Sequence, residues 1–81
     1  WLALAEGRVG FAVGDVSGHG LAAALIMATV RAMAHVLART ARDVHEFVET
    51  LRASLTPDLQ DGRFLTCCFV VVDPVTHRVD W

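Results

Sequence analysis

GDVSGHG, residues 14–20, is the stretch that decides the fold, because it joins a β-like run to a long apolar helix. The run before it leads to Asp15, which therefore lies at the end of a strand. We expect Gly14, Gly18 and Gly20 to let the backbone turn sharply and come close to a ligand. This corner, an aspartate flanked by three glycines, is a candidate site for a hard cation or a phosphate.

The residues before this stretch predict a hairpin. Residues 2–5 and 9–13 have the composition of two short strands. Between them, Gly7 supplies the positive φ that tight hairpin turns require. The second strand delivers Asp15.

The residues after this stretch predict a long helix. Residues 21–39 are rich in strong helix formers and contain no Gly or Pro, so we expect one helix of about five turns. It is apolar nearly all round as far as Val30, which predicts cover by a sheet on one face and by another helix or chain on the other. The apolar run, residues 21–30, is shorter than the roughly 20 residues of a bilayer span. We therefore expect a buried helix and no membrane in this segment.

A second, amphipathic helix follows. Asp43 as N-cap and Glu46, which would reach back, have the spacing of a capping box, and Pro57 ends the helix. Its apolar residues repeat at helical spacing: Val44, Phe47, Val48, Leu51 and Leu55.

The last part of the chain predicts two more strands. Residues 64–72 form an apolar run too continuous for a one-sided strand, which predicts a central strand buried on both faces. Asp73 and Pro74 start a turn, and residues 78–81 return as a second hairpin. The order β-β-α-α-β-β predicts an α+β fold, with two helices packed on an antiparallel sheet.

Composition narrows the class of protein. A chain of 81 residues with 54% hydrophobic content is enough for one small core and too short for two domains. Both ends look cut, so we expect residues 1–81 to be a partial domain truncated at both ends. The net charge of −2 and the scattered basic residues argue against nucleic acid as a partner. Cys67 and Cys68 should point to opposite faces of one strand and stay unpaired, which favours a cytoplasmic location.

Asp15 is the first candidate for chemistry. Its carboxylate and the main-chain carbonyl of Val16 are oxygen donors of the kind that Mg²⁺ and Mn²⁺ prefer, although such ions take about six ligands. The spacing of the residues also allows a structural role for Asp15, and such a role is more common for an aspartate in this position. In that role, Asp15 caps the following loop or helix by accepting hydrogen bonds from backbone N–H groups.

Ser17 and His19 do not fit a serine hydrolase. Their frame does not match the G-x-S-x-G elbow, and triad partners converge from distant segments rather than from one loop. We interpret Ser17 as a loop hydroxyl that satisfies backbone groups, and His19 as an exposed residue. No nucleotide-binding loop or zinc site fits the sequence either. We therefore predict no catalytic side chain and no residue for an organic cofactor.

Residues 13–27, VGDVSGHGLAAALIM, resemble the signature loop and first helix of the SpoIIE/RsbU-like bacterial branch of the PPM protein phosphatases. The resemblance covers the whole chain in order and includes Phe64-Leu65-Thr66 leading a strand to Asp73-Pro74. Residues 76–78 depart mildly, since relatives often carry Gly in this turn. The resemblance implies that the chain is a piece of an α-β-β-α sandwich.

The resemblance also implies a function, namely metal-dependent hydrolysis of phosphoserine or phosphothreonine on a signalling protein such as an anti-sigma-factor antagonist. It implies a pair of Mn²⁺ or Mg²⁺ ions, bridged by the carboxylate of Asp15 and bound by the carbonyl of Val16. Water activated by the ions would be the nucleophile, so no side-chain nucleophile is required. The family's other metal-binding acids are expected before Trp1 and beyond Trp81. We therefore expect the 81 residues alone to be inactive.

Two other functions stay open. A non-catalytic regulatory module of the same fold would use residues 21–36 and 44–55 as a homodimer face, with a degenerate metal site. A plain structural fragment is compatible with everything except the glycine loop. In either case, missing strands would leave open sheet edges and apolar faces, so we expect the isolated piece to aggregate or form oligomers.

Overall fold

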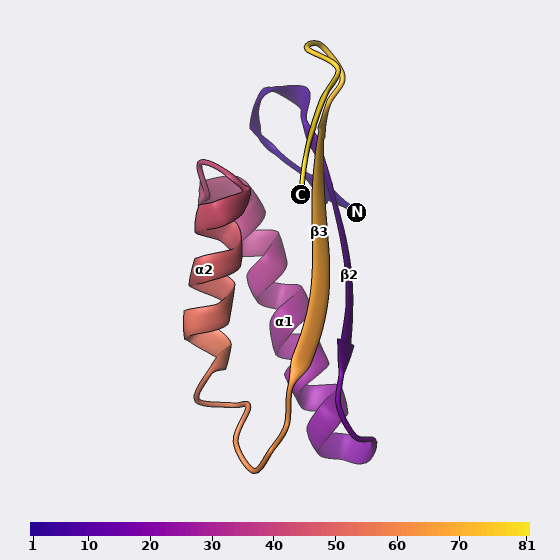
Figure 1. Cartoon of the computed structure of the whole chain (residues 1–81), viewed down its shortest axis with the longest axis vertical. Helices are drawn as coiled ribbons and strands as arrows, with labels where there is room; N and C mark the ends of the chain where they lie inside the picture. The colour runs from indigo at the N-terminus through magenta and orange to yellow at the C-terminus, as the bar shows by residue number, and fades with distance from the viewer.

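The chain folds as the α+β arrangement that its sequence predicts (Figure 1). The computed structural model describes all of residues 1–81 and contains a four-stranded antiparallel sheet of order β1-β2-β3-β4 with two helices. The connection from β2 to β3 carries both helices. The elements are β1 (Leu2–Ala3), β2 (Val9–Val16), α1 (Gly20–Thr40), α2 (Val44–Leu55), β3 (Leu65–Asp73) and β4 (Arg78–Asp80).

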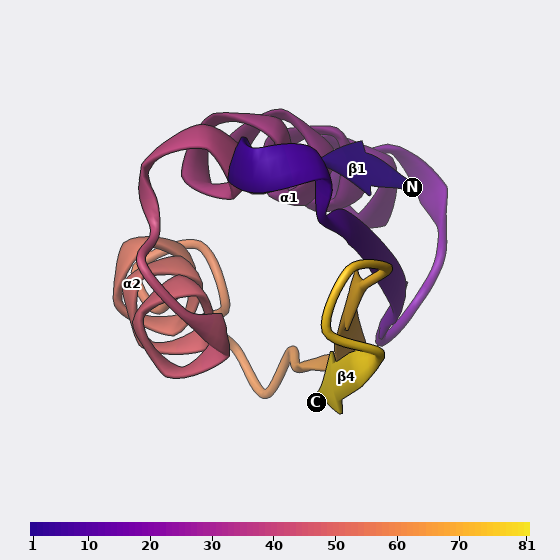
Figure 2. The ribbon, with the colours of Figure 1, turned by 90° about the horizontal axis from the view of Figure 1, so that it is seen from above.

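Both helices lie on the same side of the sheet (Figures 1 and 2). Helix α1 contacts β1 and β2, whereas α2 contacts α1 and β3. The core fills the space between the helices and the sheet. Its most deeply buried side chains come from α2 and are Phe47 and Leu55.

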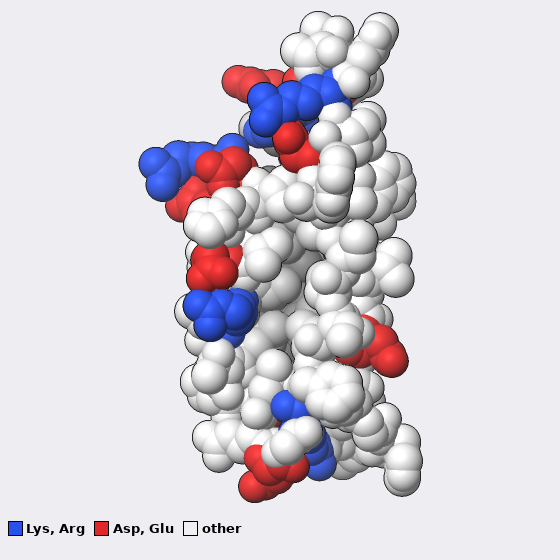
Figure 3. All heavy atoms as spheres, in the orientation of Figure 1, with Lys and Arg blue, Asp and Glu red and all other residues white.

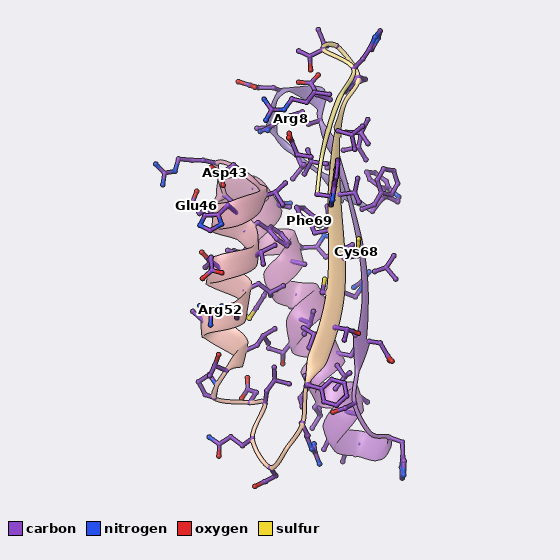
Figure 4. The ribbon with its side chains drawn as sticks, in the orientation of Figure 1. Arg8, Asp43, Glu46, Arg52, Cys68 and Phe69 are labelled. Atoms are coloured by element: carbon purple, nitrogen blue, oxygen red, sulfur yellow. The ribbon has the colours of Figure 1, made fainter.

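The pairing of β2 with β3 decides which residues face the helices. Gly10 lies opposite Val71 and Val16 opposite Leu65, and successive side chains alternate between the two faces. Figure 4 shows Phe69 on the helix side of β3 and Cys68 on the other side. The side away from the helices is called the outer face below. It carries Val9, Phe11, Val13 and Asp15 of β2 and Thr66, Cys68, Val70 and Val72 of β3.

The first hairpin is confirmed, with different strand lengths from those predicted. Strand β1 is only two residues long, and a short 3-10 turn, Ala5–Gly7, follows it with Gly7 at φ 74°. Strand β2 continues beyond Val13 and through Asp15, because β3 begins early enough to pair with it as far as Val16. Asp15 is therefore the penultimate residue of a strand and not part of a loop.

Helix α1 has nearly the predicted bounds, and as predicted both the sheet, through β1 and β2, and the other helix, α2, pack against it. One stripe of the helix is buried, and it consists of Ile26, Val30, Ala34 and Ala38. The opposite stripe is exposed, with Leu21 at 77% and Leu25 at 59%, because no other part of the chain packs there. By length and composition alone, α1 is also the one helix that could cross a membrane. Its packed stripe is typical of a core helix.

Strand β3 is central in the sheet, as predicted, but it is buried on one face only. Phe69 and Val71 are buried beneath the helices. Thr66 and Cys68, on the outer face, are exposed because nothing covers that face. The thiols of Cys67 and Cys68 are free, as expected.

Of the two hydrogen bonds that the predicted capping box implies at the start of α2, one is confirmed and the other has a different donor. The Asp43 carboxylate accepts a hydrogen bond from the Glu46 N–H at 2.8 Å. Glu46 reaches back to the N–H of Arg42, at 2.7 Å, rather than to that of Asp43. This bond and the Arg42 guanidinium hold the pKa of Glu46 below its ordinary value. Figure 4 shows Asp43 and Glu46 together at this end of α2.

Charged side chains lie at the two ends of the molecule and along α2 (Figure 3). A separate carboxylate lies on the edge of the molecule opposite α2, and the surface between that edge and α2 is mostly uncharged on the face shown. Two of the ion pairs lie within α2 or at its start, and they join Arg42 to Glu46 and Arg52 to Glu49. All of these charges are solvated, so they contribute little to stability.

Candidate metal centre

The Asp15 side chain points to the outer face of the sheet. It follows Phe11 and Val13 at intervals of two residues, and it lies opposite Thr66 of β3. Asp15 is exposed. The aspartate carboxylates that accept hydrogen bonds are those of Asp43, Asp73 and Asp80. The carboxylate of Asp15 is therefore free to take a ligand.

Asp15 is not the cap of the following helix, which was the commoner role on spacing alone. The N-cap of α1 is His19, and no side chain caps this end of the helix. Between Asp15 and the helix, Gly18 and Gly20 adopt φ values of 85° and 83°, which side chains with a Cβ atom rarely adopt. The turn separates the carboxylate from the first N–H groups of α1.

The strand register leaves the main-chain carbonyl of Val16 without a hydrogen-bond partner in β3. The N–H of Ser17 donates to the carbonyl of Phe64 at 2.8 Å, so these two residues form a hydrogen-bonded pair of the antiparallel ladder. Such pairs alternate with pairs whose main-chain groups point away from the partner strand. Val16, opposite Leu65, therefore directs its carbonyl away from β3. On the other side of β2, β1 pairs only with Val9 and Gly10 and does not reach Val16.

The corner formed by Asp15 and Val16 thus offers two oxygen donors, one charged and one neutral. Both are of the type that Mg²⁺ and Mn²⁺ prefer, but they are too few for a shell of about six ligands. No group of three or more His, Cys, Asp or Glu side chains comes together anywhere in the structure. The residues present fit a divalent cation in donor type and form only part of its site.

The other sequence candidates lie away from this corner or have structural roles. His19 is exposed, as predicted, and so are the remaining histidines. Burial raises the pKa of the Cys67 thiol, and this residue lies on the helix side of β3, whereas Asp15 lies on the outer face. Two hollows in the surface, of about 660 and 770 Å³, are lined by neither Asp15 nor Val16. These hollows therefore do not mark the candidate site.

Two residues near the corner escaped the sequence prediction because their role depends on strand register. The Thr66 hydroxyl donates to the carbonyl of Asp15 at 3.4 Å. The main-chain N–H of Phe64 donates to the hydroxyl of Ser17 at 2.8 Å. The prediction that Ser17 satisfies a backbone group is confirmed, but its partner lies 47 residues away rather than in the loop.

A comparison with protein families places this geometry in context. The family described as Stage II sporulation protein E (SpoIIE) matches residues 5–81. The chain belongs to the SpoIIE family. The match confirms the resemblance carried by residues 13–27. No curated protein and no solved structure matches the chain.

Membership of the SpoIIE family gives the chain a phosphatase-related or regulatory role. The family includes protein phosphatases of the PPM type, which generally use Mn²⁺ or Mg²⁺. The SpoIIE chain described here carries one exposed carboxylate and one free carbonyl at the corner where β2 ends.

Proposed function

We propose that this SpoIIE-family chain is part of an enzyme that hydrolyses phosphoserine or phosphothreonine on a protein partner. In this proposal, Asp15 and the carbonyl of Val16 hold part of a pair of Mn²⁺ or Mg²⁺ ions. The observation that carries the proposal is the free carboxylate of Asp15 on the outer face. An anti-sigma-factor antagonist or a similar signalling protein is the proposed substrate.

The charge of the corner supports a role for a cation. A carboxylate and a phosphate are both anions, so Asp15 alone would repel a phosphorylated side chain. A divalent ion held by the carboxylate reverses the sign of the local charge. When bound, such ions supply an activated water and neutralise charge on the phosphoryl oxygens.

The chain's own contribution is to fix its two donors. Strand pairing on either side of Val16, between Asp15 and Thr66 and between Ser17 and Phe64, holds the main chain at this point. Donors held in a fixed geometry need little rearrangement when a ligand binds. Further carboxylates from outside residues 1–81 would complete the site, and the 81 residues alone would be inactive.

The proposal is tested in the full-length parent protein with a phosphoserine peptide and Mn²⁺. Asp15→Ala and Asp15→Asn should both lower turnover by more than about 100-fold, since changes to residues that merely support a metal ligand already cost 10–100-fold. Asp58→Ala, which removes an exposed carboxylate far along the chain in the turn after α2, is the matched control. Unchanged turnover in both Asp15 variants would refute the proposed role.

A second candidate function is a non-catalytic regulatory module that pairs through its helices. The exposed apolar stripe of α1 favours it, because Leu21, Leu25 and Val36 lie on the side opposite the buried stripe. In this proposal, the stripe forms a homodimer face. Leu25→Glu should then shift the parent protein from dimer to monomer in sedimentation, while Val75→Glu, in the exposed turn between β3 and β4, should not.

We place the action of the protein in the cytoplasm. The two free cysteines support a reducing compartment, since they lie on opposite faces of one strand and form no disulfide. The stripe of α1 that packs against the sheet supports a helix inside a folded domain rather than in a membrane.

A further inference from the structure

The chain leaves the sheet at Ser17, where the side-chain hydroxyl replaces the main-chain carbonyl as the hydrogen-bond acceptor for Phe64. In a regular antiparallel ladder, the pair of residues 17 and 64 would exchange two main-chain hydrogen bonds. The first of these bonds is present, from the Ser17 N–H to the Phe64 carbonyl at 2.8 Å. In the second, the Phe64 N–H donates to the Ser17 hydroxyl at 2.8 Å instead of to the Ser17 carbonyl.

This exchange allows the chain to turn without leaving a donor unpaired. The carbonyl of Ser17 is released from the ladder, and the next residue, Gly18, adopts φ 85°. The N–H of Phe64 keeps a partner, which matters because an unpaired backbone donor costs free energy. Ser17 thus stays attached to β3 through its side chain while its main chain turns towards α1.

The bond also limits how Val16 can move. On one side of Val16, Asp15 is tied to β3, where the Thr66 hydroxyl donates to its carbonyl at 3.4 Å. On the other side, Ser17 is tied to Phe64 by two hydrogen bonds. The Val16 side chain is itself buried under the helices. The peptide group that carries the Val16 carbonyl is therefore held from three directions.

We propose that Ser17 is a positioning residue for the candidate metal centre, an inference that rests on the function proposed above. Ser17 does not touch the metal or the substrate. Its hydroxyl, by replacing its own carbonyl as the acceptor for Phe64, keeps the Val16 carbonyl and the Asp15 carboxylate directed towards the same ion. Without the hydroxyl, the Phe64 N–H would draw the carbonyl of residue 17 back into the ladder and rotate the adjoining peptide.

The test compares Ser17→Ala with Ser17→Thr in the full-length parent protein. Ser17→Ala removes the acceptor, whereas Ser17→Thr keeps a hydroxyl at the same atom. Ser54→Ala, on the exposed face of α2, makes the same chemical change where the side chain forms no hydrogen bond. The variants are assayed by phosphoserine-peptide turnover at increasing Mn²⁺, by calorimetric titration of Mn²⁺, and by hydrogen exchange of the Phe64 amide.

Ser17→Ala should raise the Mn²⁺ concentration for half-maximal turnover about 10-fold or more, and weaken Mn²⁺ binding to a similar extent. At saturating Mn²⁺, kcat should stay within about 2-fold of the wild-type value, because the residue acts on metal binding and not on the chemical step. The Phe64 amide should exchange faster. Ser17→Thr should restore all three properties, and Ser54→Ala should change none.

Two results would overturn the inference and leave the proposed function intact. One is an active wild-type protein whose Mn²⁺ dependence is the same in Ser17→Ala. The other is a Ser17→Ala protein that loses kcat at saturating Mn²⁺ together with its thermal stability, which indicates a general structural role. A wild-type protein that neither binds Mn²⁺ nor turns over the peptide would refute the proposed function, and the inference with it.

Discussion

The ring of Phe47 on α2 lies parallel to the ring of Phe69 on β3, with 3.9 Å between the ring centroids and 5° between the planes. Both residues are buried, Phe47 to 2% exposure and Phe69 to 5%. This stack is the main aromatic contact between a helix and the sheet. It packs α2 against β3 within the core that α1 shares.

Phe47→Ala should lower the free energy of unfolding by about 3–5 kcal/mol, because it removes a fully buried ring and leaves a cavity beside Phe69. Urea unfolding followed by fluorescence or circular dichroism measures the change. Phe64→Ala is the control, since that ring is mostly exposed and its loss should stay within about 0.5 kcal/mol. Equal effects in the two variants would contradict the packing described here.

Gly10 is expected to tolerate no larger residue. A Cβ atom at this position would lie 3.2 Å from two carbons of the Phe69 ring, which is also stacked on the ring of Phe47. Gly10→Val should therefore destabilise the protein by about 1–3 kcal/mol through overpacking. Ala3→Val, at the exposed position of β1, also places a valine in a strand and should have little effect. The two midpoints of thermal unfolding give the comparison.

Stability should fall in acid partly through Asp73. The main-chain N–H groups of Thr76 and Val75 donate to its carboxylate and hold the pKa of Asp73 below its ordinary value. A carboxyl whose pKa is lower in the folded state stabilises the fold above its unfolded pKa, which is about 3.9 for Asp, and this contribution disappears as the pH falls through the folded value. Asp73→Asn should make the acid loss of stability shallower below about pH 4.

The matched control for the acid experiment is Asp58→Asn. The carboxylate of Asp58 accepts no hydrogen bond, and only the main-chain N–H of this residue is bonded, to the carbonyl of Leu55. Chemical unfolding at a series of pH values should therefore show the wild-type slope for Asp58→Asn. A slope for Asp73→Asn that equals the wild-type slope would rule out the role given to the turn.

The outer face should make the isolated 81-residue chain associate with itself. Phe11, Val13 and Val79 are exposed on the sheet, next to strand edges that can pair with another chain. Val13→Lys should shift sedimentation towards smaller species. Val75→Lys, which places the same charge in the β3–β4 turn, should not. A wild-type chain that sediments as a monomer would contradict this prediction.

Much of the fold could be predicted because local signals and the overall arrangement agree. The N-cap at Asp43, the helix end before Pro57 and the turn at Asp73 depend on residues close together in the chain, and all three are present. The main error concerns burial, because β3 is predicted to be buried on both faces and is buried on one. Periodicity shows that β3 and α1 are apolar on two sides, but it cannot show which of those sides another part of the chain reaches.

The candidate site was predictable only in part, for the same reason. The sequence singles out Asp15 and Val16 by the glycines that follow them. Whether the Val16 carbonyl is free depends on its pairing with Leu65, and that register is set by residues about 50 positions away. The hydrogen bond from Phe64 to Ser17 crosses the same distance and leaves no local signal.

The helix-facing side of β2 has one further consequence, for how the protein can evolve. Its residues before Val16 are Gly10, Ala12 and Gly14, the smallest side chains available. Every substitution at a glycine adds volume, and at Gly14 an added Cβ atom would lie 3.2 Å from the Thr66 carbonyl. Mutation at Gly10 or Gly14 can therefore change this side of the strand only towards crowding. Descendants of this sequence should vary at Gly10 chiefly in combination with smaller residues at Phe69 or Leu4, whose side chains an added Cβ atom would meet.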